Sequence, residues 1–315
     1  MVYSAWKLFE SHLKEVLQGK KTIAMEYSPR GAIPTASKVD GGMLDLVREQ
    51  GVNVVSSASF LQNFTCVWTD EQYMMHKEAA EVLDTIAMTT WGWIRDRLKQ
   101  DEQITEYTVQ QYILTEMKKH KCVMEGAPIC GVNQNSANPH YNPQMKGCRS
   151  IKKGDFILID LWCKRDLPRA VYADITRVAV AGAPTKRHQE IFQIVRNAQK
   201  AGTDLVRERV QKRKEVRGAE VDDACRKVIV DAGYGDYFTH RTGHNIHMDD
   251  HGPGANIDGF ETLDDRLLIP KTCFSIEPGI YLPKEFGVRL EYDIYINENH
   301  SIEVTGGIED KLFVL

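Results

Sequence analysis

Three of the chain's ten histidines lie in one nine-residue stretch, Gly243-His244-Asn245-Ile246-His247-Met248-Asp249-Asp250-His251. A fourth, His240, precedes it by only a few residues. Neutral imidazole is a common ligand for transition metals, although a single histidine is more often a structural residue. Four histidines within twelve residues are not explained by a solvated helix or strand face. We therefore interpret this stretch as part of a site and read outward from it.

Carboxylates stand in apolar surroundings on both sides of the histidine stretch. Downstream are Glu277, in Ser275-Ile276-Glu277-Pro278-Gly279, and Glu291, in Arg289-Leu290-Glu291. Upstream are Asp160, between Ile159 and Leu161, and Asp174, fourteen residues later. A carboxylate in an apolar strand is costly to desolvate without a cation or a partner. Two aspartates, one histidine (His244) and two glutamates suit a pair of divalent metal ions.

Each of these residues also has a plain structural interpretation. Asp160 and Asp174 fit strand-end turns, and Glu277 fits a strand-end residue that faces solvent. Glu291 fits an ion pair with Arg289, because strand alternation places the two on one face. The residue types leave these alternatives open.

Composition excludes several functions. The chain is 42% hydrophobic and 27% charged, with a net charge of −4 and a pI near 6.2. This balance offers no basic surface for nucleic acid or an anionic membrane. No apolar run approaches the length of a membrane span, and the first residues lack the pattern of a secretory signal. Seven scattered cysteines without a CxxC motif indicate reduced thiols, and so a cytoplasmic protein.

Hydrophobic periodicity predicts an α+β fold in two domains. Residues 1–69 give a helix, a strand at 21–26, a helix at 43–50 and a strand at 52–55, which indicates a small, partial α/β domain. In residues 70–315 we expect two helix pairs, each followed by strands, and so an internal pseudo-repeat. The expected helices are 70–99, 105–119, 185–210 and 219–232, with Thr105 as an N-cap. The expected strands include 156–162, 173–180, 272–277, 287–297 and 302–305, the first two forming a hairpin through a 163–172 loop.

Taken together, the motifs of residues 70–315 resemble the pita-bread metallopeptidases, a family that includes aminopeptidase P, prolidase and methionine aminopeptidase, with creatinase as a relative. The resemblance rests on the order Asp, Asp, His, Glu, Glu and on the local contexts. These are Ile159-Asp160-Leu161, Ala173-Asp174-Ile175-Thr176-Arg177, Arg241-Thr242-Gly243-His244, Ser275-Ile276-Glu277-Pro278-Gly279-Ile280-Tyr281 and Gly287-Val288-Arg289-Leu290-Glu291. His240 and the Gly-Val-Arg-Leu-Glu stretch favour the proline-directed branches. Residues 1–69 resemble the second half of a creatinase-type N-terminal domain, either naturally short or truncated.

The resemblance implies a fold, a reaction and a set of roles. The metal ligands would be Asp160, Asp174, His244, Glu277 and Glu291, holding two divalent ions, Mn²⁺ first and Zn²⁺ or Co²⁺ as alternatives. A metal-bridging hydroxide would attack an Xaa-Pro peptide bond, as in aminopeptidase P or prolidase. The catalytic residues would be Glu277, His251 and His140, and the substrate-binding residues His240, His251, Arg289 and His247. The partners implied are small peptides with proline after the scissile bond and a second copy of the chain in a homodimer.

Three departures from the family pattern bear on specificity. Trp162 stands where the family commonly has glycine, and His247 stands in place of a glycine of the Gly-His-Gly-Ile-Gly motif. The two aspartates are usually eleven residues apart, so the 163–172 segment is longer here. Trp162 and His247 add bulk, and we expect both to change substrate preference.

Two other functions fit a protein of this fold. One is a creatinase-like hydrolase that cleaves a C–N bond of a small substrate without metal. The other is a non-catalytic module that binds peptides or proteins. Neither gives a reason for the chain to keep all five ligands, so the metallopeptidase is the preferred hypothesis.

Overall fold

The computed structural model describes residues 2–315, which form two compact units divided between Thr65 and Cys66. This division precedes the expected boundary at residues 69 and 70. The reason is local, because the amide of Trp68 donates to the carbonyl of Lys271 at 2.8 Å and so ties the connecting segment to the second unit. Each unit is described by itself.

The first unit is a small α/β unit with a two-stranded parallel sheet. Its elements are α1 (Trp6–Leu17), β1 (Thr22–Met25), η1 (Pro29–Gly31), η2 (Pro34–Ala36), α2 (Gly41–Glu49), β2 (Asn53–Ser56) and α3 (Ala58–Thr65). Strands β1 and β2 pair from Thr22 with Asn53 to Met25 with Ser56. Leu17, Val47 and Val52 form its small buried core. The two expected strands and two expected helices are present, and α3 is an additional helix.

The second unit contains two long helix pairs, and their ends follow from capping. These helices are α4 (Asp70–Lys99), α5 (Glu106–Lys119), α6 (Lys186–Gln211) and α7 (Gly218–Asp231). The hydroxyl of Thr105 accepts from the amide of Thr108 at 3.1 Å, so Thr105 is the expected N-cap of α5. Thr69 and Thr185 cap α4 and α6 in the same way.

The strands of the second unit form two larger sheets and one pair. They are β3 (Cys122–Val123), β4 (Ile129–Val132), β5 (Phe156–Arg165), β6 (Ala173–Val180), β7 (Asn245–Ile246), β8 (Cys273–Ile276), β9 (Gly279–Tyr281), β10 (Gly287–Arg289), β11 (Tyr292–Ile296), β12 (Ile302–Thr305) and β13 (Phe313–Val314), with short helices η3 (Asn133–Asn135) and η4 (Gly235–Tyr237). One sheet has the order β13-β6-β5-β3, with β4 also paired to β5, and the other the order β12-β11-β8-β7. Strands β9 and β10 form the separate antiparallel pair.

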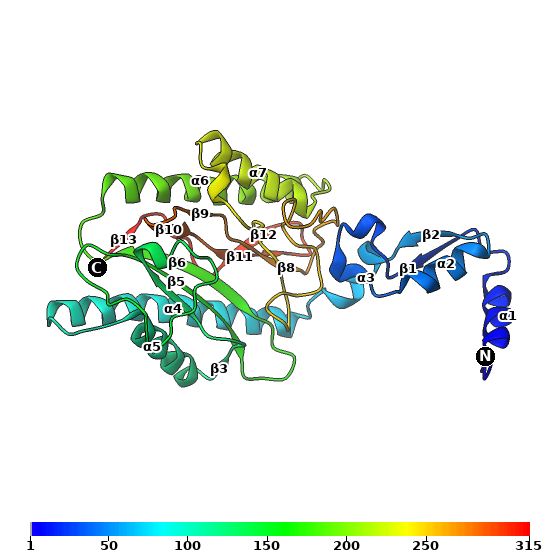
Figure 1. The fold of residues 1–315 in the computed structure, drawn as a ribbon, viewed down its shortest axis with the longest axis horizontal. Helices are drawn as coiled ribbons and strands as arrows, with labels where there is room; N and C mark the ends of the chain where they lie inside the picture. The colour runs from blue at the N-terminus through cyan, green and yellow to red at the C-terminus, as the bar shows by residue number, and fades with distance from the viewer. Residues whose placement is uncertain (1) are drawn as a thin grey trace. The chain divides into compact units, whose positions relative to one another are not determined.

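The strands lie between two layers of helices, with α6 and α7 on one side and α4 and α5 on the other (Figure 1). Ile157, Ile159 and Leu161 of β5 belong to the core shared with α4 and α5. Phe156 and Leu158, the alternate residues, belong to the core shared with α6 and α7. Each helix pair is followed by its own strands, as the expected pseudo-repeat requires.

Two strand expectations were wrong in detail. Strand β5 continues to Arg165, beyond the expected end at residue 162, because its last residues pair with β6 and β3, Cys122 lying opposite Arg165. The expected strand 287–297 is two strands, because β10 pairs with β9 whereas β11 pairs with β8 and β12. Leu290 and Glu291 lie between them. Within residues 2–315 no helix is long and apolar enough to span a membrane, and no disulfide joins the cysteines.

Candidate metal centre

Strand alternation places the first three polar residues of the site on one face of the β5–β6 hairpin. Side chains two residues apart share a face, and the odd-numbered residues of β5 face α4 and α5. Asp160 therefore lies on the opposite face, directly across from Thr176 on β6. Asp174, two residues before Thr176, lies across from Trp162. The hairpin thus presents two carboxylates and a hydroxyl together.

The β7–β8 pairing brings His244 and Glu277 to the same place. The amide of Ser275 donates to the carbonyl of His244 at 2.9 Å, and the amide of His244 donates to the Ser275 hydroxyl at 3.0 Å. Two residues further along the same pairing, the amide of Glu277 donates to the carbonyl of Thr242. A Cβ on Gly243 would lie 2.0 Å from the Ser275 carbonyl oxygen, so only glycine allows this approach. His244 and Glu277 are positioned by backbone pairing.

Glu291 reaches the site from the break between β10 and β11. Its amide donates to the carbonyl of Thr176, and its Oε2 lies 2.6 Å from the Thr176 hydroxyl. The interruption of the strand, which the sequence pattern did not predict, lets this residue turn from its own sheet toward β6. Glu291 is 1% exposed.

The five expected ligands line one pocket. The His244 Nε2 lies 3.5 Å from Oε1 of Glu277 and 3.7 Å from Oδ2 of Asp174. Ligand atoms of Asp174, His244 and Glu291 all lie within 4.8 Å of one another. Carboxylate oxygens and an imidazole at this spacing suit divalent transition metals.

The pKa values of the clustered carboxylates also bear on whether the pocket holds cations. Burial raises the pKa of Asp174 and Glu291 well above the ordinary range, and neighbouring carboxylates raise it further. Burial likewise raises the pKa of Glu277 to about 7. Oδ1 of Asp174 and Oε1 of Glu291 are buried without a hydrogen-bond partner. Buried carboxylates with unpartnered oxygens are costly to keep ionised without a cation, so the site fits divalent metal ions.

The guanidinium of Arg289 lies close to several of these carboxylates. It pairs with Asp160, donates from Nε to the Thr176 hydroxyl at 2.8 Å, and lies 4.0 Å from both Glu277 and Glu291. The structural alternative for Glu291, an ion pair with Arg289, is therefore present together with the carboxylate cluster. Glu291 can therefore be both a partner of Arg289 and a metal ligand, the two interpretations that the sequence left open.

The pocket that contains the cluster has a volume of about 340 Å³ and is also lined by Trp162 and by three of the expected histidines, His140, His240 and His251. His240 is fixed by the carbonyl of Arg241 and by the hydroxyl of Tyr281, each within hydrogen-bond distance. His247 is buried and does not line the pocket. It is separated from His244 by the two residues of β7, and an odd separation in extended chain places side chains on opposite faces. The structure therefore does not bring His247 together with the other expected substrate-binding residues, which line the pocket.

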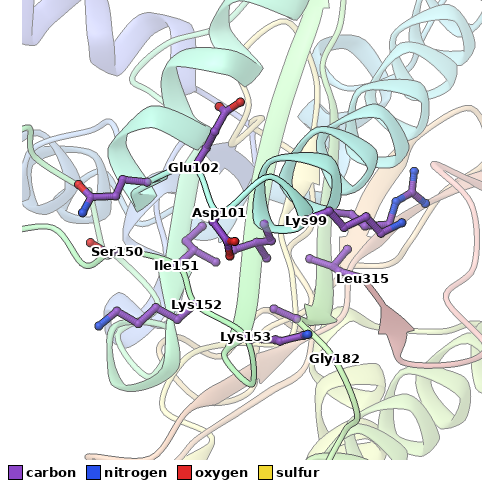
Figure 2. Close-up of a pocket in the computed structure, with 13 residues that line it drawn as sticks. Lys99, Asp101, Glu102, Ser150, Ile151, Lys152, Lys153, Gly182 and Leu315 are labelled. Carbon is purple, nitrogen blue, oxygen red and sulfur yellow. The ribbon is translucent and has the colours of Figure 1, made fainter.

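A larger cavity of about 520 Å³ lies elsewhere in the second unit (Figure 2). Lys99, Lys152 and Lys153 line it, together with the acidic residues Asp101 and Glu102. It contains no histidine and none of the expected site residues. Size alone does not make it the site, because the convergent buried ligands lie in the smaller pocket.

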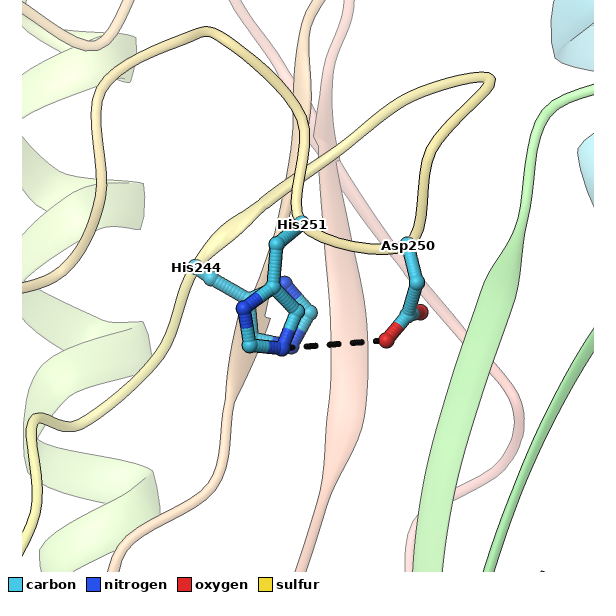
Figure 3. Close-up of side chains that lie close together, drawn as sticks. All are labelled: His244, Asp250 and His251. Atoms are coloured by element: carbon cyan, nitrogen blue, oxygen red, sulfur yellow. Dashed lines mark ion pairs between the residues drawn. The ribbon is translucent and has the colours of Figure 1, made fainter. Parts of the chain in front are cut away.

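Asp250 is a pocket residue that sequence reasoning did not single out. Figure 3 shows its carboxylate directed toward the ring of His251, which lies against the ring of His244 with centroids 3.9 Å apart. Ligand atoms of His244, Asp250 and His251 lie within 4.8 Å of one another. The signal was present, since Asp250 directly precedes His251 in the histidine stretch.

The fold and the centre together define an α+β protein with a buried site for divalent metals, and comparisons with known proteins agree. Residues 75–298 match the sequence profile described as Metallopeptidase family M24. The chain is 35% identical over 236 residues to the Xaa-Pro dipeptidase of Lactobacillus delbrueckii subsp. lactis, an alignment that covers 74% of this chain and 58% of that protein. The chain therefore belongs to metallopeptidase family M24.

Solved structures show the same relationship. The dipeptidase from Pyrococcus horikoshii OT3 is 27% identical with a TM-score of 0.69, and the match covers 97% of this chain and 78% of that one. For the prolidase from Pyrococcus furiosus the identity is 25%, the TM-score 0.66 and the coverage 98% and 81%. The predicted pita-bread fold is confirmed. The chain spans 58% and 64% of the length of two curated relatives that it matches.

Proposed function

We propose that this chain is a peptidase that hydrolyses Xaa-Pro bonds with a pair of divalent metal ions, Mn²⁺ in the first instance. The observation that carries the proposal is the convergence of five ligand residues in one buried pocket, with unpartnered oxygens on Asp174 and Glu291. The names of the relatives, an Xaa-Pro dipeptidase and a prolidase, support the substrate class. A homodimer remains part of the proposal.

The ligands would be Asp160, Asp174, His244, Glu277 and Glu291. Bound divalent ions would lower the pKa of a water molecule and polarise the scissile carbonyl. Thr176 holds Glu291 in place by a hydrogen bond, and outer contacts of this kind orient metal ligands.

Glu277 is the residue that we propose as the proton carrier. Its Oε1 lies 3.1 Å from the Ser275 hydroxyl, which orients the carboxylate within the pocket. From there Glu277 accepts a proton from the attacking water and delivers it to the leaving nitrogen. When the leaving residue is proline, that nitrogen belongs to a tertiary amide without an N–H, so the delivered proton is needed for departure.

His251 and His140 are exposed side chains that line the pocket, and we propose that both contact the substrate. Arg241 donates from Nη2 to Nδ1 of His251 at 3.0 Å, so the proton of neutral His251 resides on Nε2. An Nε2–H directed into the pocket is suited to stabilise the oxygen of a tetrahedral intermediate. Desolvation of the ring by its neighbours lowers the pKa of His251 to about 4, with the charge of Arg241 as a further cause, which favours the neutral donor.

The experiment is a reconstitution. The purified protein is stripped with a chelator, reloaded with Mn²⁺, and assayed against Xaa-Pro dipeptides and Xaa-Pro-Yaa tripeptides. We expect metal-dependent cleavage of at least one class and about two metal ions per chain by elemental analysis. Absence of cleavage in both classes would reject the peptidase, and absence of metal would favour the creatinase-like or binding alternatives.

A further inference from the structure

Asp250 is a carboxylate in the pocket that the proposed metal ligands leave unused. Its Oδ1 is buried and has no hydrogen-bond partner. Its Oδ2 lies 3.7 Å from Nε2 of His251, which is beyond hydrogen-bond length. Both oxygens therefore remain available on a side chain that lines the pocket.

The segment that carries Asp250 is held in place by its neighbours. Lys164 donates from Nζ to the carbonyl of Met248 at 2.6 Å, and the amide of Gly252 donates to Asn245 at 2.7 Å. A Cβ on Gly252 would lie 2.4 Å from Oδ1 of Asn245, so glycine is required for this closure. The position of Asp250 in the pocket is built into the fold and is not a chance surface conformation.

Charge balance indicates what Asp250 meets there. Four carboxylates belong to the proposed ligand set, and two divalent ions carry the four positive charges that offset them. Glu261 accepts from the backbone of Arg241 and lies 3.8 Å from its guanidinium. Asp250 and Arg289 are then the remaining charged residues of the described pocket lining, apart from histidines. Because Arg289 is already engaged by Asp160 and by the Thr176 hydroxyl, a loaded pocket leaves the Asp250 carboxylate for the substrate.

We propose that Asp250 binds a cationic nitrogen of the substrate residue on the amino side of the scissile bond. A free peptide offers a positive charge on that side, either as its α-ammonium group or as a basic side chain. A carboxylate with available oxygens in a desolvated pocket forms a charge-assisted hydrogen bond with either group. This inference rests on the proposed function and assigns it a further substrate-binding residue, Asp250.

Three ligands that cannot be cleaved separate the two nitrogens. They are ketone analogues of lysyl-proline, norleucyl-proline and hexanoyl-proline, with a carbon in place of the proline nitrogen. Lysine and norleucine differ by the side-chain cation, whereas norleucine and hexanoyl differ by the α-amine. Dissociation constants are measured by calorimetry on the Mn²⁺-loaded protein. In the wild type we expect at least one pair to differ by roughly tenfold, as for a hydrogen bond to a charged group.

In Asp250→Asn that difference should fall to about twofold or less, and Asp250→Ser serves as a second variant if the first unfolds. Asp249→Asn is the matched control, because Asp249 is exposed, adjacent and absent from the pocket lining, and it should retain the wild-type ratio. If the Asp250 variant loses the difference in affinity between the lysyl and norleucyl analogues, Asp250 binds the side-chain ammonium. If it loses the difference between the norleucyl and hexanoyl analogues, Asp250 binds the α-ammonium. A wild type without any preference, or an Asp250 variant that keeps it, overturns the inference. Cleavage of lysyl-proline is assayed separately, so failure of the peptidase is distinguished from failure of the cation site.

Discussion

The hydroxyl of Thr176 lies 2.6 Å from Oε2 of Glu291 and joins two parts of the chain separated by 115 positions. The same hydroxyl accepts a hydrogen bond from Nε of Arg289 at 2.8 Å. Thr176 is fully buried, so neither contact competes with solvent. One side chain of β6 therefore sets the direction of a proposed ligand and of the guanidinium beside it.

Replacing this hydroxyl should weaken metal binding. Thr176→Val keeps the shape of the side chain but leaves Glu291 without its orienting contact. Loss of an outer contact of this kind costs roughly 10–100-fold in metal affinity. We expect the dissociation constant for Mn²⁺, measured by calorimetry, to rise by about that factor.

Thr203→Val is the matched control for this experiment. Thr203 is also buried, and its hydroxyl contacts the hydroxyl of Tyr292 at 2.7 Å, outside the pocket. Its loss should lower the free energy of unfolding by about 1 kcal/mol without changing metal affinity. Equal metal affinity in Thr176→Val and in the wild type would contradict the role of Thr176.

Asp174 provides a test of metal binding through stability. Its Oδ1 is buried without a partner and its neighbours are carboxylates. A metal ion that binds here in the folded chain and not in the unfolded chain should therefore stabilise the fold. We expect Mn²⁺ to raise the Tm of the wild type, and Asp174→Asn to abolish that rise while retaining or increasing the Tm without metal. Differential scanning calorimetry with and without Mn²⁺ measures both. Asp166→Asn, an exposed position, should respond to Mn²⁺ like the wild type; a Tm rise in Asp174→Asn would count against the assignment.

Much of the metal centre was predictable because its residues sit in short motifs with strong local constraints. Asp160 and Asp174 could be placed together once residues 156–162 and 173–180 were recognised as a hairpin, since pairing and alternation follow from the pattern. The close approach of Gly243 to Ser275, which excludes a Cβ, was by contrast visible only in the structure. The family resemblance then supplied the roles that spacing alone left open.

The parts that were not predictable depend on long-range pairing. The sequence pattern of residues 287–297 does not indicate that β10 and β11 belong to different sheets. The break between these two strands directs Glu291 toward Thr176. The orientation of His247 follows from the two-residue strand β7, too short to be recognised from periodicity. The position of Asp250 is decided by Lys164 and Asn245, which hold its loop from other elements.

His76 of α4 predicts a dependence of stability on pH that does not involve the metal centre. Its Nδ1 lies 2.7 Å from the carbonyl of Tyr172 and its Nε2 lies 2.7 Å from the hydroxyl of Thr305. Burial lowers its pKa to about 4 from 6.5. The unfolded chain therefore binds more protons than the folded chain between these two values. The stabilisation is complete above about pH 6.5 and is lost as the pH falls toward about 4.

The size of this effect is on the order of 3 kcal/mol, from the shift and the free energy of one pKa unit. We expect the free energy of unfolding of the second unit to fall by that order between pH 7 and pH 4 through His76 alone. Urea unfolding gives the free energy of unfolding of the wild type and of His76→Gln at each pH across this range. The contribution of His76 is the difference between the two proteins in the slope of that free energy against pH. Identical slopes in the two proteins would show that His76 does not titrate as expected.

Gly243 links backbone packing to the centre and gives the last prediction. A Cβ at this position would meet the carbonyl oxygen of Ser275 at 2.0 Å, so β7 and β8 must separate to admit it. Gly243→Ala should destabilise the protein by about 1–3 kcal/mol, the usual cost of overpacking. Because His244 follows directly and is paired to Ser275 through its backbone, the same separation should also weaken Mn²⁺ binding.

Gly259→Ala separates this effect from the general cost of replacing a glycine. An added Cβ there would find its nearest neighbour, Oδ2 of Asp222, at an ordinary 3.4 Å. We expect a change within about 0.5 kcal/mol and unaltered metal affinity. Thermal unfolding and calorimetric titration with Mn²⁺ on both variants measure the two quantities. If Gly243→Ala behaved like Gly259→Ala in both, backbone approach at Gly243 would not be what positions His244.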